Sequence, residues 1–286
     1  MINLLSTEML KSLYRNLFPP IVVKMLRRLL NRKIDSVTYE GVFESFKAVI
    51  DQYGNQPNYS TVSNLNEAFD RFRGLIDCYR TQEDVSPNWS NARFNFFGSF
   101  ISALNLSQIE ILDVGGGFGE TFLYLKRATT KKYRYHIVEL GETLALLNDH
   151  PIDFSELTYS NTLSEVRMNP QVIYFGSSLQ YFADYTDILI QSQEMQPEFI
   201  VISDTPMGEI QSFVCAQVNM PDIVIPRWVF NEQEIISILR RDNYELVHQS
   251  SNFYPFHNFS NYDAEFHQIQ HRNLIFRNHY FVKPMN

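Results

Sequence analysis

The sequence predicts an α/β protein in which a largely parallel sheet is covered by helices on both faces and is preceded by a helical region. Two observations lead to this fold class. After Asn105, seven short apolar runs typical of strands alternate with stretches at helical spacing. The first run leads directly into a glycine-rich loop and a helix, a junction at which open α/β sheets bind their ligands.

The composition is that of a globular protein with a sizeable core. Of the 286 residues, 44% are hydrophobic and 20% are charged, which excludes disordered, collagen-like and coiled-coil proteins. Cys78 and Cys215 lie far apart and fit neither a disulfide framework nor a cysteine zinc site, so a reducing compartment and a cytoplasmic location are expected. The net charge of −8 gives no general footprint for nucleic acid, and no nucleic-acid partner is expected.

Residues 1–33 differ from the rest of the chain in charge. They hold seven basic side chains and one acidic side chain, whereas the remaining 253 residues carry 17 basic and 31 acidic ones. Apolar residues recur at helical spacing, but charges and the Pro19-Pro20 pair leave no run of about 20 apolar residues to span a bilayer. A secretory signal is not expected either. This basic amphipathic arm is expected either to pack on the body of the protein or to touch anionic lipid at the inner membrane.

Residues 34–90 are expected to form a helical N-terminal region or lid. Apolar and aromatic residues recur three and four positions apart from Val42 to Ile50 and from Leu65 to Tyr79, with a turn cluster at 54–58 between them. A further helix over about 91–104 opens the third region, a ligand-binding domain over residues 91–286.

Seven runs of this third region are assigned to strands. They are 110–114, 135–139, 157–159, 172–175, 199–203, 244–248 and 273–281. The last two are separated by an aromatic and histidine-rich stretch in place of a clear helix, so the final strand is expected to be antiparallel.

The most informative segment is 111–121, in which an apolar strand enters a glycine loop. The spacing is G-x-G-x-G, whereas dinucleotide sites use G-x-G-x-x-G, and this difference decides against NAD. S-adenosylmethionine has no phosphate, and its site needs backbone lying flat under the methionine part and an acid for a cationic ligand. The residues expected to do this are Asp113, Gly115, Gly116, Gly117 and Gly119.

A second acid supports the same cofactor. The next strand ends at Glu139, twenty residues past Gly119, where a carboxylate can accept both ribose hydroxyls. The alternative is that the glycines form only a tight turn and that Glu139 is a solvated loop acid. Three spaced glycines together with a correctly placed acid favour the cofactor site.

Segment 111–121 resembles motif I of the class I S-adenosylmethionine-dependent methyltransferases. The resemblance covers about residues 90–286 and implies a Rossmann-like seven-stranded sheet, S-adenosyl-L-methionine as methyl donor and S-adenosyl-L-homocysteine as product. More narrowly, the whole chain resembles a bacterial group of methyltransferases found among genes for O-antigen and other surface polysaccharides. The matching pieces are Leu17-Phe18-Pro19-Pro20, segment 39–46, Asp113-Val114-Gly115-Gly116, segment 177–181, Asp204-Thr205-Pro206 followed by Gln217, and segment 227–231 before a helix.

Residues after the other strands are expected to complete the pocket, because ligands of open α/β sheets bind outside the carboxyl ends of the strands. After the third run, Asn161 is expected to contact the adenine, with a helix cap as the alternative. After the fourth, Ser177 and Ser178 permit close approach of the reacting methyl group. Gln180 and Tyr181 could orient an acceptor, or Tyr181 could be a core tyrosine.

Methyl transfer to oxygen requires alignment and removal of the acceptor's proton. Asp204, after the fifth run, could be the base, and so could His248, His257 or His267, whose ordinary pKa near 6.5 suits the task. A structural role is the alternative for each of them. The aromatic and amide-rich stretch 253–262 would suit a sugar surface, or it forms a hydrophobic lid or an oligomer contact.

No metal is expected, because His267 and His271 have helical spacing but lack the H-E-x-x-H glutamate. The predicted protein is a cytoplasmic methyltransferase that uses S-adenosylmethionine to modify a saccharide or its precursor at oxygen. The alternatives are a small-molecule or lipid-linked acceptor, a non-catalytic binding or scaffold protein of the same fold and, more distantly, an NAD-dependent enzyme. The oligomeric state is left open.

Overall fold

The computed structural model describes residues 38–54, 62–81, 92–220, 223–252, 259 and 262–281. The expected arm of residues 1–33 lies outside the described residues. So does most of the aromatic stretch 253–262, including His257.

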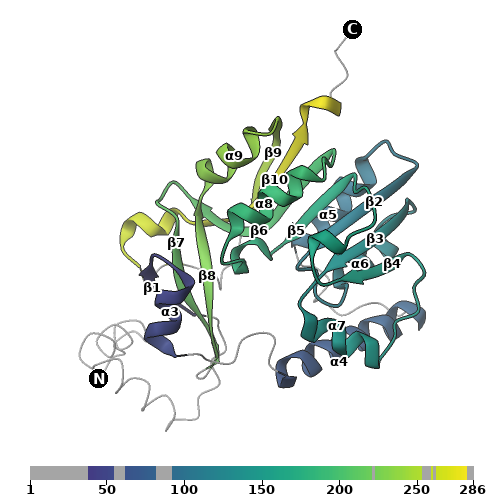
Figure 1. The fold of residues 1–286 in the computed structure, drawn as a ribbon, viewed down its shortest axis with the longest axis horizontal. Coiled ribbons are helices and arrows are strands. Elements are labelled where there is room, and N and C mark those ends of the chain that lie inside the picture. Colours follow the sequence, from purple (N-terminus) through teal and green to yellow (C-terminus); the bar gives the residue numbers. More distant parts are fainter. Residues whose placement is uncertain are drawn as a thin grey trace, which may run out of the picture.

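Seven strands form the central sheet, in the order β4-β3-β2-β5-β6-β10-β9 (Figure 1). They are β2 (Gln108–Val114), β3 (Lys132–Val138), β4 (Leu157–Ser160), β5 (Val172–Gly176), β6 (Phe199–Gly208), β9 (Tyr244–Asn252) and β10 (Gln270–Asn278). The strands from β2 to β6 pair in parallel, whereas β10 is antiparallel to both β6 and β9. The predicted α/β fold class and the antiparallel final strand are confirmed.

Helices bury the two faces of this sheet in two separate cores. One core joins β2, β3 and β5 to the helices α4 (Val62–Thr81), α5 (Ala92–Ala103) and α6 (Glu120–Ala128). The other lies on the opposite face and is covered by α8 (Tyr185–Glu194) and α9 (Glu232–Arg240). Helix α7 (Gly141–Asp149) follows β3, and short 3₁₀ turns include η2 (Leu163–Glu165), η3 (Leu179–Tyr181), η4 (Ala264–Gln268) and η5 (His279–Phe281).

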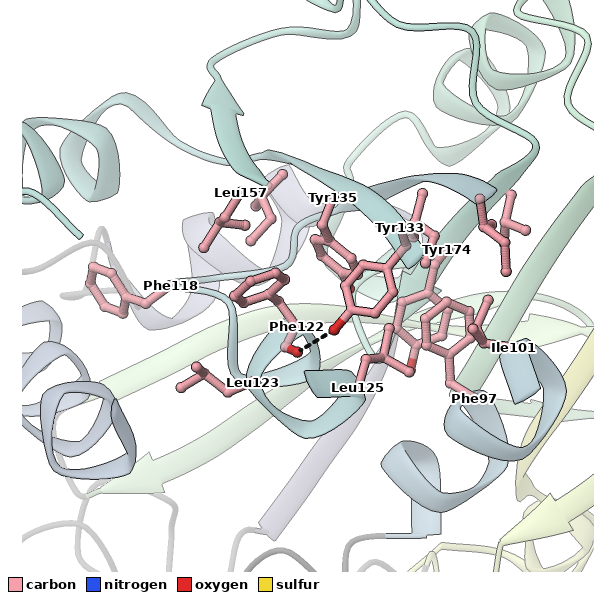
Figure 2. Packing of buried hydrophobic residues seen from close by; sticks show 14 of the residues in the cluster. Phe97, Ile101, Phe118, Phe122, Leu123, Leu125, Tyr133, Tyr135, Leu157 and Tyr174 are labelled. Carbon is pink, nitrogen blue, oxygen red and sulfur yellow. Dashed lines mark hydrogen bonds between the residues drawn. The ribbon is translucent and has the colours of Figure 1, made fainter. Parts of the chain in front are cut away.

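Aromatic side chains fill the first core (Figure 2). Phe122 of α6 lies edge-on to Tyr133 and Tyr135 of β3, with ring centroids 6.0 and 5.7 Å apart. Phe97 of α5 stacks on Tyr174 of β5 at a centroid distance of 3.8 Å. These contacts fix α5 and α6 over the strands whose carboxyl ends carry the glycine loop, so the core sets the position of that loop.

Helix α9 illustrates why the helices begin where they do. The side chain of Asn231 accepts hydrogen bonds from the backbone N–H groups of Gln233 and Glu234, at 2.9 and 3.2 Å. These bonds satisfy donors that have no partner within the helix. Glu232 and Glu234 lie in the first turn and Arg240 in the last, which matches the helix dipole.

A second, three-stranded antiparallel sheet was not predicted. It consists of β1 (Thr38–Phe43), β7 (Phe213–Met220) and β8 (Ile223–Asn231), and we call it the three-stranded extension. It joins the central sheet where Phe230 of β8 pairs with Met207 of β6 (Figure 1). One expectation is corrected here, because residues 38–43 form a strand in place of the expected helix. Strand β6 also continues beyond the predicted run 199–203, through Pro206 to Gly208.

The three-stranded extension is buried on both faces. Helix α3 (Phe46–Tyr53), capped by the Ser45 side chain, covers one face through Val49, which packs on Val214. On the other face Tyr39 stacks on Phe259, with ring centroids 5.1 Å apart. The predicted division of the chain at residues 33/34 and 90/91 stays a prediction.

Replacing Phe97 by alanine is expected to lower the free energy of unfolding by about 3–5 kcal/mol, because the ring is fully buried against Tyr174 and its removal leaves a cavity. Urea denaturation followed by circular dichroism measures the change. The matched control is Phe281→Ala at a half-exposed ring, for which a change within about 0.5 kcal/mol is expected. Equal losses for the two variants would contradict this description of the core.

Candidate functional site

The glycine loop after β2 depends on backbone conformations that side chains rarely adopt. Gly115, Gly117 and Gly119 have φ values of +75°, +60° and +107°. Gly115 also packs closely, since an added Cβ would lie 2.7 Å from Cβ of Ser178. At Gly116 an added Cβ would lie 2.5 Å from Oδ2 of Asp113. Glycine is therefore required at each of these positions, either for its positive φ or for the close packing of its Cα.

Gly117 is the loop residue that faces open space. An added Cβ at this position would meet no atom within 4 Å, although both neighbouring stretches of the loop are tightly packed. The loop therefore presents bare backbone to open space. Bare backbone here fits a cofactor whose methionine part lies against the loop, and the cofactor contacts of these residues stay a prediction.

Glu139 ties the end of β3 to this loop. Its Oε2 accepts the Gly117 N–H at 2.8 Å and its Oε1 accepts the Leu140 N–H at 2.9 Å. The Glu139 N–H in turn donates to Ser160 O at 3.0 Å, which connects β3 with β4. A carboxylate has about four acceptor positions, so two bonded N–H groups leave room for two hydroxyl donors.

Burial raises the pKa of Glu139 above its ordinary value of 4.5, although the two backbone N–H bonds act in the opposite direction. Removal of water from an ionised carboxylate is unfavourable, and here it outweighs the stabilisation by the two donors. Each additional hydrogen-bond donor would stabilise the charged form of Glu139 and lower its pKa.

Asp113 lies beneath the loop. Its side chain is buried, its Oδ2 accepts the Tyr135 hydroxyl at 2.6 Å, and Gly116 packs against its carboxyl group. In the described structure Asp113 supports the loop from below. Its expected contact with a cationic ligand stays a prediction.

The two serines after β5 differ in role. Ser178 is buried, and its hydroxyl donates to Val114 O, which joins the end of β5 to the start of the glycine loop. Ser177 is half-buried and has φ +61°, a left-handed conformation that costs a non-glycine residue about 1–3 kcal/mol. Its N–H donates to Ser203 O at 2.9 Å, so the strained residue joins the end of β5 to the bulged middle of β6.

The end of β4 lies across from the start of α7. Asn161 is exposed, its N–H donates to Glu165 Oε2 at 2.9 Å, and its Oδ1 lies 3.7 Å from the Cβ position of Gly141. Leu140 has an apolar side chain that is 55% exposed directly after Glu139. Sequence reasoning missed Leu140, although an apolar residue after a predicted ribose acid was the available signal.

Asp204 is placed by a β-bulge in β6. Thr205 pairs with Arg272 and Ile202 pairs with Leu274, so Ser203 and Asp204 together oppose the single residue Asn273 of β10. Asp204 has φ +55°, and its N–H donates to Asn273 Oδ1 at 3.1 Å. Bulges redirect a side chain and are frequent beside active sites.

A histidine and an arginine extend from Asp204. The Oδ1 of Asp204 lies 2.7 Å from His271 Nδ1, and His271 Nε2 lies 3.5 Å from Arg227 Nη2. All three side chains are almost fully enclosed. Burial lowers the pKa of His271, and the Arg227 charge acts in the same direction against the raising effect of Asp204.

Arg227 also connects this group with Tyr181. Its Nη1 donates to Tyr39 OH at 2.6 Å and to Gln217 Oε1 at 3.3 Å, and the guanidinium lies 5.0 Å from the Tyr39 ring centroid. Tyr181 donates its hydroxyl hydrogen to the same Gln217 oxygen at 2.9 Å. The structure thus connects the candidate base Asp204 with Tyr181 through His271 of β10 and through Arg227 and Gln217 of the three-stranded extension.

The other predicted bases lie elsewhere. His248 is exposed on β9 beside Phe96, and His267 is exposed on η4 and contacts Tyr262 O. The helical spacing expected for His267 and His271 is wrong, because His267 is in a 3₁₀ turn and His271 is in β10.

Sequence reasoning missed Arg227 and His271 as site residues. The available signal for Arg227 was a charged side chain in register with Ile225 and Val229, which are buried on the same strand. For His271 there was no local signal.

Within the described ranges, no group of three or more His, Cys, Asp or Glu could hold a metal ion. No helix of that part of the chain is long and apolar enough to cross a membrane.

The strand order and the glycine loop define an α/β protein with a Rossmann-like fold. No family model and no curated protein matches the sequence. Similar solved structures include a 1,6-didemethyltoxoflavin-N1-methyltransferase of Burkholderia thailandensis with 1,6-didemethyltoxoflavin and S-adenosylhomocysteine bound. It is 15% identical over 74% of this chain and 89% of its own, with a TM-score of 0.47. Another is the magnesium protoporphyrin IX methyltransferase of Synechocystis with bound S-adenosylhomocysteine, 11% identical over 81% and 99%, with a TM-score of 0.48.

The raised pKa of Glu139 gives a pH dependence of stability. An acid whose pKa is higher in the folded state holds its proton to higher pH than in the unfolded chain, so it stabilises the fold at low pH. This contribution is lost as pH rises from about 4.5 through the folded-state pKa. Between about pH 4 and pH 7, wild type is therefore expected to lose more stability than Glu139→Gln, measured by urea denaturation. Glu194→Gln, at an exposed carboxylate of α8, is the control, and an identical slope for Glu139→Gln and wild type would contradict the expectation.

Proposed function

We propose that this protein is an S-adenosylmethionine-dependent methyltransferase whose acceptor is a hydroxyl of a sugar or of a polysaccharide precursor. The observation that carries the reaction class is the bond between Gly117 N–H and Glu139. It joins a bare, outward-facing backbone loop to a half-buried carboxylate with acceptor capacity to spare.

The proposed cofactor site extends along the carboxyl ends of β2, β3 and β4. The loop from Gly115 to Gly119 holds the methionine part, and Glu139 accepts the ribose hydroxyls. Leu140 offers an exposed apolar side chain for the flat face of the adenine, and Asn161 offers an amide at its edge. S-adenosylmethionine supplies a sulfonium methyl group when it is bound.

The proposed acceptor side lies at the end of β5 and at the bulge within β6. The contact between Ser178 and Val114 brings the end of β5 to the glycine loop. Asp204, redirected by the bulge, takes the proton of the acceptor hydroxyl. Bound S-adenosylmethionine would supply the methyl group to the acceptor oxygen, and its sulfur would leave with the electron pair of the broken bond. Tyr181 orients the acceptor, with its own hydroxyl held by Gln217.

The saccharide acceptor is supported by the resemblance of the sequence to methyltransferases found among surface polysaccharide genes. A cytoplasmic location and contact of residues 1–33 with anionic lipid are part of the same proposal. A small-molecule or lipid-linked acceptor would use the same cofactor site and the same base.

Calorimetric titration with S-adenosylhomocysteine tests the cofactor. Micromolar binding is expected, with Glu139→Ala weakening it about 10- to 100-fold through loss of hydrogen bonds to a charged group. Gly117→Arg is expected to abolish binding, because its side chain would occupy the open space. Glu194→Ala and Gly74→Arg, at exposed helical positions, are the matched controls and should bind as wild type does. No heat and no thermal shift at millimolar ligand would refute the enzyme and favour a non-catalytic protein of this fold.

The base is tested with an acceptor found by screening sugar nucleotides and glycans. Asp204→Asn is expected to lower kcat about 100- to 10,000-fold, because the amide cannot take a proton. The affinity for S-adenosylhomocysteine should stay unchanged, since Asp204 lies on the acceptor side. Asp153→Asn, at an exposed carboxylate, is the control. A kcat for Asp204→Asn equal to that of the control would exclude Asp204 as the base.

A further inference from the structure

A buried arginine on an inserted sheet is an unusual neighbour for a catalytic carboxylate. Arg227 of β8 is 2% exposed, and its Nε is buried without a hydrogen-bond partner among the described residues. A buried guanidinium is unfavourable unless it is paired with an anion or well hydrogen-bonded. The nearest carboxylate along its contacts is Asp204, and His271 lies between the two.

The hydrogen bonds of His271 determine which of its two ring nitrogens carries the hydrogen. A guanidinium has five N–H donors and no acceptor, so the contact between Arg227 Nη2 and His271 Nε2 requires a lone pair on Nε2. The ring hydrogen of neutral His271 is then on Nδ1, which lies 2.7 Å from Asp204 Oδ1 and donates to it. For a neutral ring, these two contacts together select the Nδ1–H tautomer.

The charges around His271 agree with a neutral ring. Asp204 on β6 favours the imidazolium, whereas burial and Arg227 on β8 oppose it, and the net effect is a lowered pKa. Tyr39 of β1, Tyr181 of η3 and Cys215 of β7 face the guanidinium. Arg227 keeps its charge at any working pH.

We propose that Arg227 and His271 are positioning residues for the proposed base. Arg227 holds His271 as the neutral Nδ1–H tautomer, and His271 donates to Oδ1 of Asp204 so that the carboxylate keeps one fixed orientation toward the acceptor. The inference rests on the proposed function, because Asp204 needs an orientation only if it takes a proton. It assigns the three-stranded extension a role in the reaction, since Arg227, Gln217 and Tyr39 all belong to that extension.

The same residues place Tyr181. Its hydroxyl and Arg227 Nη1 share the Gln217 oxygen, so the groups that orient Asp204 also orient the tyrosine on the other side of the proposed acceptor site. One buried cation thus sets the position of two side chains, one on η3 and one on β6.

The first experiment reads the His271 tautomer without cofactor or acceptor. The full chain is labelled with ¹⁵N-histidine, and long-range ¹H–¹⁵N spectra are recorded from about pH 5 to pH 8, with the His271 signal assigned by its loss in His271→Asn. We expect a protonated Nδ1 and an unprotonated Nε2 throughout this range. An Nε2–H tautomer, or protonation of both His271 ring nitrogens within this range, would overturn the proposal.

Variants of Arg227 test whether this residue keeps His271 neutral. Arg227→Met removes the donor and the charge, so His271 is expected to become an imidazolium paired with Asp204 and to titrate at higher pH than in wild type. Arg227→Lys keeps the charge and a donor and should leave His271 neutral, and it remains informative if the methionine variant fails to fold. Arg134→Met on β3 is the control. An unchanged His271 spectrum in a folded Arg227→Met protein would overturn the proposal.

Variants of His271 distinguish its effect on the orientation of Asp204 from an effect on the stability of the fold. The amide of asparagine can replace the Nδ1–H donor to Asp204, whereas glutamine reaches toward Arg227 and loses that donor. With equal thermal unfolding midpoints, His271→Asn is expected to retain at least ten times the kcat of His271→Gln at unchanged KM. Equal kcat values would overturn the proposal. Absence of S-adenosylhomocysteine binding would refute the proposed function and the role of the base, whereas a wrong tautomer with intact binding refutes the positioning alone.

Discussion

The hydrogen bond between Gly117 N–H and the Glu139 carboxylate is the contact on which the candidate site depends. It links the ends of two adjacent parallel strands and holds a loop whose glycines have left-handed conformations. The loop cannot move without breaking either this bond or the packing of Gly115 on Ser178. The aromatic core beneath it fixes β2, β3 and α6 relative to one another, so the carboxylate and the open backbone face the same space. Local strain is offset by burial elsewhere in the sheet.

The half of the candidate site around Asp204 depends on an irregular strand, β6. The bulge in β6 turns Asp204 into a left-handed conformation, and Asn273 of β10 holds it there through the Asp204 N–H. The three-stranded extension then encloses the acid with a buried arginine. Isolated buried charges are costly, but Arg227, His271 and Asp204 form one connected group in which each polar contact supports the next. The two halves meet where Ser178 of the β5 end bonds to the β2 end.

The seven central strands could be predicted because their signal is local, with short apolar runs separated by helical spacing. The three strands of the extension could not. In β7 and β8 polar and charged residues such as Gln217 and Arg227 occupy buried positions, and Pro226 argues against a strand. Val42 of β1 lies at helical spacing from apolar residues of α3, so the sequence pattern there predicts a helix. Pairing of β1 with β7 makes this segment a strand. Pairing between distant segments overrides local preference in such cases.

The sequence by itself determined the glycine loop, its acid at position 139 and the antiparallel final strand, because backbone conformation and strand ends are set by a few neighbouring residues. It also nominated Asp204 and Tyr181 from their places after strands. Only the tertiary structure decided what surrounds them. Asp204, Arg227 and His271 come from three strands far apart in the chain, and they meet because one strand is bulged and another is inserted. Their protonation and orientation follow from burial and from mutual contact, neither of which local sequence encodes.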